Sequence, residues 1–480
     1  MNFQHRCVRS NFFVRGLVLL ACVAVAQPVM AGWSEKQKII STPPGVGAEF
    51  GNAIAISGNT MVVGAHNTAP NQEGAAFVYE LNGTTWTQKA KLVAGVIAGI
   101  SPAATDHFGY SVAISGDTIV VGAPSTFGSL TNPGSVYVFV RNGMTWVEQK
   151  KLTGGMAGDE FGQSVAIQGE TLVVGAHLVD FPIPNMVNQF WSDAGSAYIF
   201  RRSGTVWMQT QQLKPTLSAV PNPSPILGDL FGSSVAISGN FIAVGAEGDD
   251  MPLTRAGTVY VFAKNSVGTY VQQPKLFVGG GGNGDRLGYS VALEGNTLVA
   301  GAPYYTPHTG PPLYTQNSGE THRGAAYVFE FNGATWALPK KLVASDGLLG
   351  DHFGWSVAVS SNVIAVGARD DDMAAGQDAG STYVFTQSFS QSVSVWTESQ
   401  KLAPSSPFNG DRFGESVAWS FGNLVVGAAL KPLNPGQGAA YYFVPVGSIW
   451  WVGFGIIALV VLIAIMMRGT IGRLFPRRDP

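Results

Sequence analysis

The chain has 480 residues, of which 46% are hydrophobic and 12% are charged, with 61 glycines and a formal net charge of −2. The charged share is about half of the usual value of roughly 25%, whereas glycine exceeds its usual share of about 7%. So much apolar sequence excludes a disordered chain, because burial of apolar area offsets the entropy lost on folding. The composition instead indicates many short strands joined by tight turns.

The first 31 residues have the pattern of a secretory signal peptide. Three arginines precede an apolar run over residues 16–26, and the small residues that end at Ala31 suit signal peptidase. We therefore expect the mature chain to start at Gly32. A lipoprotein signal with a lipidated Cys22 is the alternative. Cys7 and Cys22 are the two cysteines of the chain, so we expect no disulfide in the mature protein.

The other end carries 19 uncharged, mostly apolar residues, 449–467, followed by four arginines. A helix of this length nearly spans the hydrocarbon core of a bilayer, about 30 Å. The arginines favour a cytoplasmic tail. We expect a transmembrane helix over 446–468, a basic tail over 469–480, and a body exported to the periplasm or cell surface. A buried core helix is one alternative. A removable sorting signal, with Pro, Ser and Trp of 444–450 in the matching places, is another.

The charge of the body argues against nucleic acid as a partner. The two ends hold seven of the 28 basic residues and one of the 30 acidic residues, which leaves the body near −8. Nucleic acids and anionic lipids attract basic surfaces. We therefore expect no nucleic acid, and contact with the membrane only through the C-terminal helix.

A Phe-Gly pair, with Leu in place of Phe in one copy, recurs seven times at intervals of 53 to 70 residues. A short alternating strand, a β-rich strand such as TIVVGA, a loop and a third strand follow each pair. A fourth strand then starts at an aromatic residue, six times in all. The pairs are Phe50-Gly51, Phe108-Gly109, Phe161-Gly162, Phe231-Gly232, Leu287-Gly288, Phe353-Gly354 and Phe413-Gly414, and the aromatics are Trp86, Trp146, Trp207, Tyr270, Trp336 and Trp396.

The seventh outer strand stands at the front of the mature chain, where Trp33 opens WSEKQKI with the same spacing. We expect it to complete the last sheet, because a closed ring leaves no sheet face unpaired. A solenoid would also explain the repeats, but it gives no reason for a repeat split between the two ends. The predicted fold is an all-β, seven-bladed β-propeller of four-stranded blades over residues 32–445, in which each Phe packs between blades.

A Phe-Gly pair followed by a strand that ends in Gly-Ala-Pro, as at 122–124 and 301–303, resembles the FG-GAP repeat of integrin α-subunit heads. The resemblance covers about 410 residues and implies a seven-bladed propeller used for extracellular binding. Integrin-type repeats often bind calcium in an Asp-rich loop between the first and second strands. Here that connection is as short as Ser115 to Thr118, too short to surround a cation. We therefore expect a short-loop variant that needs no metal or other cofactor.

One residual calcium candidate is formed by Asp370, Asp372 and Asp378, which match the first, third and ninth positions of such a loop. A solvated acidic loop is the alternative. His66 and His177 follow Gly-Ala in two blades that are not adjacent, so we expect loop histidines that share no metal.

An aspartate stands two residues before the Phe-Gly position in six blades. We expect a repeated structural hydrogen bond, from a backbone N–H of the turn to the carboxylate. A ring of catalytic acids is the alternative. The six residues are Asp106, Asp159, Asp229, Asp285, Asp351 and Asp411.

The sequence contains no nucleophile elbow, paired zinc ligands, phosphate-binding loop or dinucleotide fingerprint. We expect a binding or adhesion protein without catalytic residues, whose partner is a protein or a glycan. A structural or assembly protein of the cell envelope is one alternative. A hydrolase or lyase with a loop-built active site is the other.

Two kinds of connection vary most in length: those between the second and third strands, and those between the fourth strand and the next blade. In an up-and-down blade they share one face. The two longest, about 177–194 and 303–323, carry aromatic residues that we expect to contact the partner. In the alternative, these aromatics fold back as plugs over the ring. The predicted contact residues are Phe181, Phe190, Trp191, Tyr304, Tyr305 and Tyr314.

Overall fold

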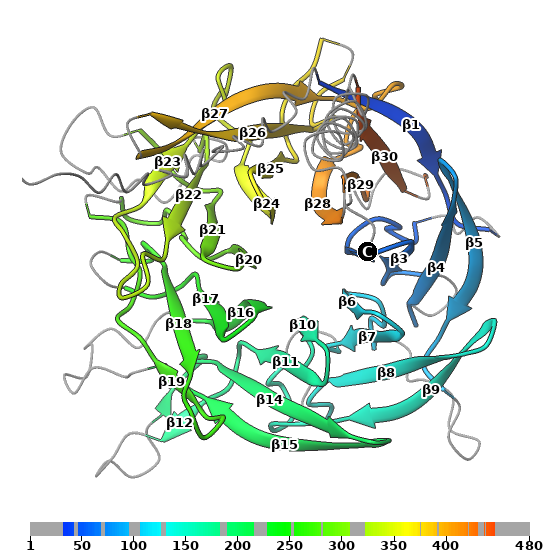
Figure 1. The fold of residues 1–480 in the computed structure, drawn as a ribbon, viewed down its shortest axis with the longest axis vertical. Coiled ribbons are helices and arrows are strands. Elements are labelled where there is room, and N and C mark those ends of the chain that lie inside the picture. The colour runs from blue at the N-terminus through cyan, green and yellow to red at the C-terminus, as the bar shows by residue number, and fades with distance from the viewer. Residues whose placement is uncertain are drawn as a thin grey trace, which may run out of the picture. The chain divides into compact units, whose positions relative to one another are not determined.

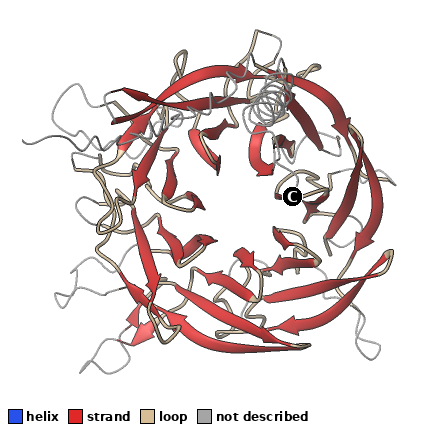
Figure 2. Ribbon diagram, in the orientation of Figure 1, coloured by secondary structure: helices blue, strands red, loops and turns tan. Residues whose placement is uncertain are grey.

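Seven four-stranded antiparallel sheets follow one another around a ring in the computed structural model (Figure 1). They belong to one unit, Gly32–Val446, and every element assigned among the described residues is a strand (Figure 2). The described residues are 32–42, 47–68, 73–95, 106–125, 131–182, 190–215, 228–250, 254–279, 282–307, 322–374, 376–390, 393–420, 422–430, 436 and 438–446.

Each sheet is a blade whose strands run in order from the inside to the outside of the ring. Blades 1 to 3 are β2 (Ile54–Ser57), β3 (Thr60–Ala65), β4 (Ala75–Asn82), β5 (Thr85–Leu92); β6 (Ser111–Ser115), β7 (Thr118–Ala123), β8 (Ser135–Asn142), β9 (Thr145–Leu152); and β10 (Ser164–Gln168), β11 (Thr171–Ala176), β14 (Ser196–Ser203), β15 (Val206–Leu213). Blades 4 and 5 are β16 (Phe231–Ser238), β17 (Phe241–Ala246), β18 (Thr258–Lys264), β19 (Tyr270–Gln272); and β20 (Ser290–Glu294), β21 (Thr297–Ala302), β22 (Ala325–Glu330), β23 (Lys340–Leu342). Blades 6 and 7 are β24 (Phe353–Ser360), β25 (Val363–Ala368), β26 (Ser381–Ser390), β27 (Val393–Leu402); and β28 (Phe413–Ser420), β29 (Asn423–Ala428), β30 (Ala439–Pro445), β1 (Trp33–Ile39).

The predicted signal peptide and the predicted transmembrane helix beyond Val446 lie outside the described residues, and both stay predictions. Within the part of the chain that the structure describes, no helix has the length and apolar character needed to cross a bilayer.

The second strand of each blade is covered on both faces, as its nearly continuous apolar sequence predicts. All six residues of β7 are buried. Phe108 lies between two blades, since its cluster joins Val62 and Val78 of blade 1 to Val112 and Val121 of blade 2. Its ring meets that of Tyr137 edge to face, with centroids 5.3 Å apart. The prediction that the repeated Phe packs between blades is confirmed.

Two glycines of each repeat let the backbones of neighbouring blades approach closely. A Cβ added to Gly122, the glycine of Gly-Ala, would lie 2.1 Å from the carbonyl oxygen of Gly162 in the next Phe-Gly pair. Gly162 itself has φ +101°, a conformation that side chains rarely permit. The same contact recurs around the whole ring and closes it between Gly427 and Gly51, at 2.0 Å.

A serine two residues after Gly of the Phe-Gly pair ties each inner strand to the next blade. The hydroxyl of Ser111 donates to the carbonyl of Gly162 at 2.8 Å, and Ser416 donates to Gly51 at 2.7 Å across the closing junction. Blade 1 has Ala53 in this place, and the amide of Asn52 donates to Gly109 instead, at 3.3 Å. Each junction of the ring therefore keeps a polar contact beside its apolar core.

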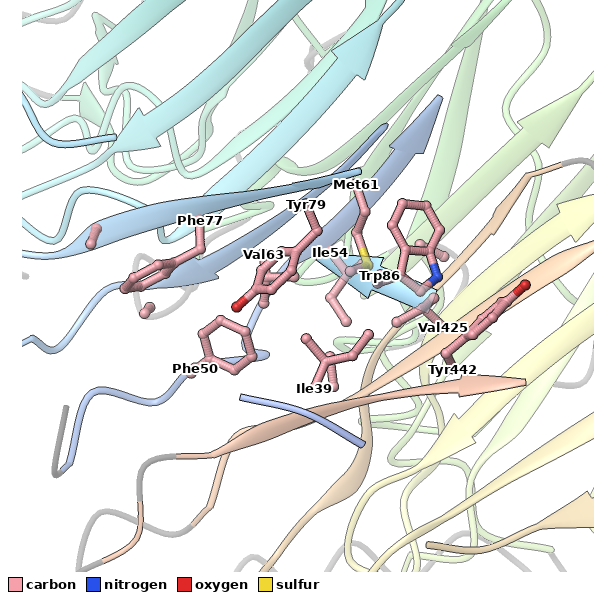
Figure 3. Close-up of a cluster of buried hydrophobic side chains, with 14 of the residues drawn as sticks. Ile39, Phe50, Ile54, Met61, Val63, Phe77, Tyr79, Trp86, Val425 and Tyr442 are labelled. Atoms are coloured by element: carbon pink, nitrogen blue, oxygen red, sulfur yellow. The ribbon is translucent and has the colours of Figure 1, made fainter. Parts of the chain in front are cut away.

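The N-terminal strand closes the ring as predicted. β1 pairs antiparallel with β30 from Trp33↔Pro445 to Ile39↔Ala440, with a register shift between Glu35 and Gln37. Ile39 enters the core between blades 7 and 1, beside Phe50 and Tyr442 (Figure 3). The last blade is thus built from both ends of the unit without a covalent link.

Two outer strands are shorter than the sequence pattern predicts. β19 and β23 have three residues each, whereas β5, β9 and β15 have eight. Pro274 and Pro339 stand in these segments, and proline has no N–H to donate to a strand ladder. The aromatic spacing found the outer strands of blades 4 and 5, but the prolines limit their regular pairing.

Candidate functional site

The connections between second and third strands, and those from each fourth strand to the next blade, lie at the same end of the antiparallel blades. We call this end the variable-loop face. The Phe-Gly and Gly-Ala motifs end there, so the residues beside them surround the mouth of the ring. The two-residue hairpin turns lie at the opposite end.

Four of the six repeated aspartates make the predicted structural hydrogen bond on this face. Asp351 accepts the backbone N–H of Leu348 at 2.6 Å, and Asp411 accepts that of Phe408 at 2.9 Å. Burial raises the pKa of Asp351 to about 6 and that of Asp285 to about 7. The same contact, from the third residue before the aspartate, occurs at Asp159 and Asp285. These carboxyls are buried fold elements.

The residue before each Phe-Gly position adopts a left-handed conformation, with φ between +53° and +56°. Glycine would adopt it without strain, whereas other residues pay about 1–2 kcal/mol each. None of the seven is glycine, and their side chains differ from blade to blade. They are Glu49, His107, Glu160, Leu230, Arg286, His352 and Arg412.

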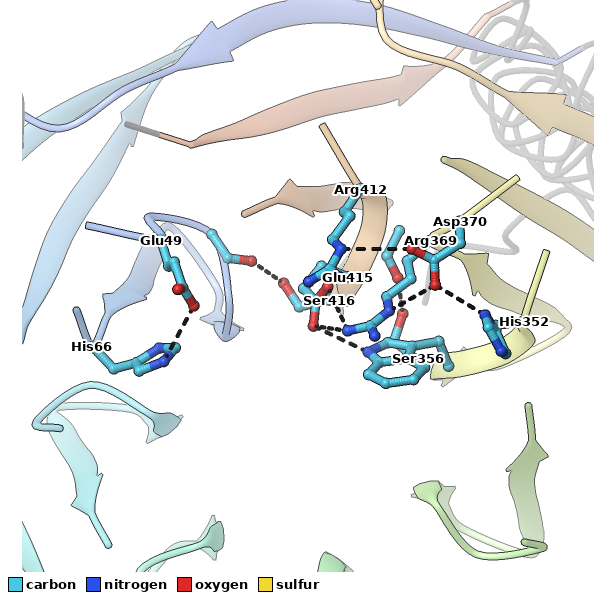
Figure 4. Close-up of polar contacts among 12 residues, drawn as sticks. Glu49, His66, His352, Ser356, Arg369, Asp370, Arg412, Glu415 and Ser416 are labelled. Carbon is cyan, nitrogen blue, oxygen red and sulfur yellow. Dashed lines mark hydrogen bonds and ion pairs between the residues drawn. The ribbon is translucent and has the colours of Figure 1, made fainter. Parts of the chain in front are cut away.

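Blades 6 and 7 place an arginine in a cage of aromatic and acidic groups at the mouth (Figure 4). The guanidinium of Arg369 lies 3.1 Å from the centroid of the Trp355 ring and donates to both oxygens of Glu415 at 3.1 Å. It also donates to Asp370 at 3.1 Å, and His352 contacts the same oxygen at 2.9 Å. Such a cage fixes the charged group before any ligand arrives.

An aromatic cluster continues from this cage toward blade 5. The rings of Tyr289 and Trp355 are 4.5 Å apart, and Tyr304 lies 5.2 Å from His352 and 5.4 Å from His322. Trp355 lies in β24, whereas the other side chains come from three connections, and each of them is only partly buried. The cluster therefore offers aromatic faces at the variable-loop face.

The mouth also carries two histidine–glutamate pairs, one in blade 1, next to blade 7 (Figure 4), and one in blade 3. The Nε2 atom of His66 lies 3.2 Å from Glu49, and that of His177 lies 3.8 Å from Glu160. Burial, together with His107, lowers the pKa of His66 to about 4, and burial lowers the pKa of His177 to the same value. The Nδ1 atoms of both histidines have no hydrogen-bond partner among the described residues.

Glu160 also differs from an ordinary surface carboxylate. Burial, with the charge of Asp193, raises its pKa to about 7, and its Oε1 atom has no hydrogen-bond partner in the described part of the chain. His66 and His177 lie in the turns that follow β3 and β11, as predicted for loop histidines. They are largely buried at the mouth, because the left-handed residues before Phe-Gly bring Glu49 and Glu160 against them.

The predicted contact aromatics separate into three groups. Phe181 pairs with Trp191, and Pro182 with Phe190, in a small hairpin of β12 (Phe181–Pro182) and β13 (Phe190–Trp191). Lys214 lies 4.4 Å from the Phe181 ring. Phe190 is half exposed. The hairpin therefore forms a separate aromatic group in blade 3.

In blade 5, Tyr304 joins the mouth cluster, whereas Tyr305 is buried and its hydroxyl accepts a hydrogen bond from Lys341 at 2.9 Å. Tyr314 lies outside the described residues. The other five predicted contact residues are described, and they belong to the two longest connections. Contact of any of them with a partner stays a prediction.

The residual calcium candidate is occupied by protein groups. Burial alone would raise the pKa of Asp370, but His352 and Arg369 lower it to about 2. Asp372 accepts the backbone N–H of Asp378 at 2.8 Å. The carboxylates of Asp370 and Asp372 thus have separate protein partners. Among the described residues, no group of three or more histidine, cysteine, aspartate or glutamate side chains is arranged to hold a metal ion.

Most of the mouth residues were missed by the sequence reasoning, which singled out His66, His177, Tyr304 and Asp370. The sequence signal that could have found them is variation between blades: the Phe-Gly motif repeats, whereas the residues on either side of it differ. Only the folded ring shows that these positions from different blades meet.

The FG-GAP repeat matches seven segments of the chain: residues 33–79, 86–139, 146–200, 227–262, 270–329, 336–385 and 396–443. The chain belongs to the FG-GAP repeat family. Six of these segments begin at the aromatic that opens an outer strand, so each such repeat joins the outer strand of one blade to three strands of the next. A comparison with curated proteins finds no match.

Proposed function

We propose that this chain is an exported, membrane-anchored binding propeller that recognises a protein or glycan with its variable-loop face and catalyses no reaction. The export signal and the apolar C-terminal run in the sequence support this location. FG-GAP propellers are typically binding modules, which supports the coarser part of the proposal.

The left-handed residues before Phe-Gly carry the proposal. A repeat selected for folding alone has no need of four kinds of side chain at seven strained backbone positions where glycine fits. Strain of this kind is retained where a side chain has a function. In blades 2 and 5 the residues are His107 and Arg286, which contact the rings of His66 and Tyr304, respectively.

Exposed apolar side chains on the same face give further support. Met156, Leu348 and Phe408 are 79%, 60% and 66% exposed. Their backbone N–H groups are the ones held by the repeated aspartates. Because their backbones are already held, these residues lose little conformational freedom when a partner covers them, which lowers the entropy cost of binding.

The test is binding of the full chain to a glycan array and a panel of purified surface proteins. The double variant His107→Gly with Arg286→Gly should keep the melting temperature within a few degrees, because glycine relieves the strain, yet lose at least tenfold in binding. The matched control is Met144→Ser with Val267→Ser, two exposed residues in hairpin turns of the opposite face, and it should bind as the wild type does.

Replacing Pro182 to Asp193, and separately Tyr304 to Thr321, by Gly-Ser linkers tests the two long connections. Each folded variant should bind more weakly. Undiminished binding by the glycine variant and by both linker variants would show that another surface recognises the partner.

Glu160 favours one alternative function, acid–base catalysis at the mouth. A carboxyl with a pKa near 7 and an unpartnered oxygen beside a neutral histidine suits proton transfer. A panel of glycosidase, esterase and lyase substrates decides this: turnover that is lost in Glu160→Gln would establish an enzyme.

A further inference from the structure

Blade 5 contains a small pocket on the variable-loop face, away from the mouth cluster. Its volume is about 180 Å³, space for roughly six water molecules at about 30 Å³ each. Two connections build it, one before β22 and one after β23. The lining residues are Tyr305, Pro307, Arg323, Gly324, Lys341, Val343, Ala344 and Gly347.

The lysine in this pocket belongs to a repeated position, the residue before the last apolar residue of the outer strand. In blade 4 the ammonium of Lys275 lies 3.0 Å from Asp249, and in blade 6 that of Lys401 lies 2.7 Å from Asp371. Both aspartates stand three residues after the alanine of Gly-Ala. These two blades thus neutralise the lysine with a loop carboxylate.

Blade 5 has Tyr305 in the place of that aspartate. The ammonium of Lys341 donates to the Tyr305 hydroxyl at 2.9 Å and lies 4.7 Å from its ring centroid. In blades 2, 4, 6 and 7 the equivalent lysine lies over the tyrosine of the third strand instead. A neutral phenol takes the place of the loop carboxylate, so Lys341 has no ion-pair partner among the described residues, and the loop tyrosine holds its ammonium at the pocket.

Arg323 adds a second positive charge to the lining, and none of the described lining residues is acidic. Within the described part of the chain, no carboxylate lies within 4.0 Å of the charged nitrogens of Lys341 or Arg323. The buried Asp285 interacts electrostatically with Lys341, but burial raises its pKa to about 7, and it accepts the backbone N–H of Gly282 at 2.6 Å. Guanidinium and ammonium groups together favour an oxyanion.

The remaining walls are apolar or bare backbone: Pro307, Val343, Ala344 and two glycines. An inorganic anion would leave these walls without contacts. A compact ring that carries a carboxylate would use both parts of the pocket, with its C–H groups on the apolar walls and its oxygens on the two cations.

We propose that the blade 5 pocket binds the carboxylate-bearing ring of an acidic sugar residue, so that the ligand of this propeller is an acidic glycan. The inference rests on the proposed binding function and names the chemistry of its partner. Lys341 and Arg323 bind the carboxylate, and Tyr305 positions Lys341.

The experiment measures binding of D-glucuronate to the full chain by saturation-transfer NMR, with D-glucose, inorganic sulfate and N-acetylglutamate as separate probes. D-glucuronate should bind at one site, and its affinity should fall with added salt, whereas D-glucose should not bind. Lys341→Gln and Arg323→Gln should each lower the affinity at least tenfold. Lys151→Gln, the equivalent exposed lysine of blade 2, is the control and should bind normally.

Equal binding of D-glucose, unchanged binding by Lys341→Gln, or binding of sulfate or N-acetylglutamate alone would overturn the proposal. The variants must keep the melting temperature of the wild type, which exposed side chains permit. If D-glucuronate does not bind but the full chain still binds a partner on the array through the mouth, only the acidic-sugar site is refuted. Loss of array binding with an intact glucuronate site would instead contradict the proposed role of the mouth.

Discussion

The side-chain amide of Gln400 holds the main chain of Trp33 across the junction between blades 6 and 7. The N–H of Trp33 donates to Oε1 of Gln400 at 2.5 Å, and Nε2 of Gln400 donates to the carbonyl of Trp33 at 3.0 Å. Gln37 holds Trp86 and Gln211 holds Tyr270 in the same two-point way. The N-terminal strand is therefore fixed to blade 6 as well as to blade 7.

A chain that begins at Ser41 behind the native signal peptide should fold less stably. It lacks β1, which buries Trp33 and Ile39 and supplies the fourth strand of blade 7. Loss of two buried side chains and a strand ladder costs several kcal/mol, so the melting temperature should fall by about 10 °C or more. Thermal unfolding followed by circular dichroism measures it.

Adding a peptide of residues 33–40 should restore part of the lost stability, and Lys36→Ser, an exposed change in the same strand, should leave the melting temperature unchanged. A shortened chain that melts with the intact protein would contradict closure by β1.

Gln400→Leu should destabilise the fold by about 2–4 kcal/mol, because the buried N–H and carbonyl of Trp33 both lose a partner. Gln211→Leu should have a similar effect, since it releases Tyr270 in the same way. Lys150 occupies the same place in blade 2 and is exposed, so Lys150→Leu is the control. Urea unfolding measures all three, and equal midpoints for Gln400→Leu and Lys150→Leu would refute the two-point contact.

Much of the propeller fold could be predicted because the interactions that build it are local and repeated. Phe-Gly, Gly-Ala, the aspartates and the outer aromatics each recur at one spacing. A single failure of this approach is instructive: Pro274 and Pro339 do not disturb the aromatic spacing, yet they shorten β19 and β23.

The mouth could not be predicted in the same way. Glu49 and His66 are 17 residues apart, and Arg412 reaches Asp370 from the next blade. No spacing rule relates these residues, because the curvature of the ring and the left-handed φ before Phe-Gly decide where the side chains lie. The Gln400–Trp33 contact was equally hidden, since a glutamine occupies that place in only three outer strands.

Gly122→Ala should disrupt the junction between blades 2 and 3. Its new Cβ would lie 2.1 Å from the carbonyl oxygen of Gly162, which belongs to a rigid backbone. We expect a loss of about 3 kcal/mol or more. The control, Gly143→Ala, has φ +61° but open space around it, and should cost only about 1 kcal/mol. Urea unfolding compares them, and an equal or larger loss in Gly143→Ala would contradict the close-approach explanation.

Asp285 should make stability depend on pH between about 4 and 7. Burial raises its pKa from 3.8 to about 7 in the folded protein, so the folded state keeps a proton that the unfolded chain has released. Its stabilising contribution is complete below pH 3.8 and is lost as the pH rises toward 7, by up to about 4 kcal/mol at 1.36 kcal/mol per pKa unit.

Asn cannot ionise, so the free energy of unfolding of the wild type minus that of Asp285→Asn should fall over this range and then level off. For Asp351→Asn the difference should level off near pH 6, because burial raises the pKa of Asp351 only to about 6. Urea unfolding at half-unit steps from pH 4 to 8 measures both differences. A difference that stays constant across the range for Asp285, or one that rises with pH, would show that its carboxyl is ionised in the folded protein and that the turn before Leu287 binds a charged group.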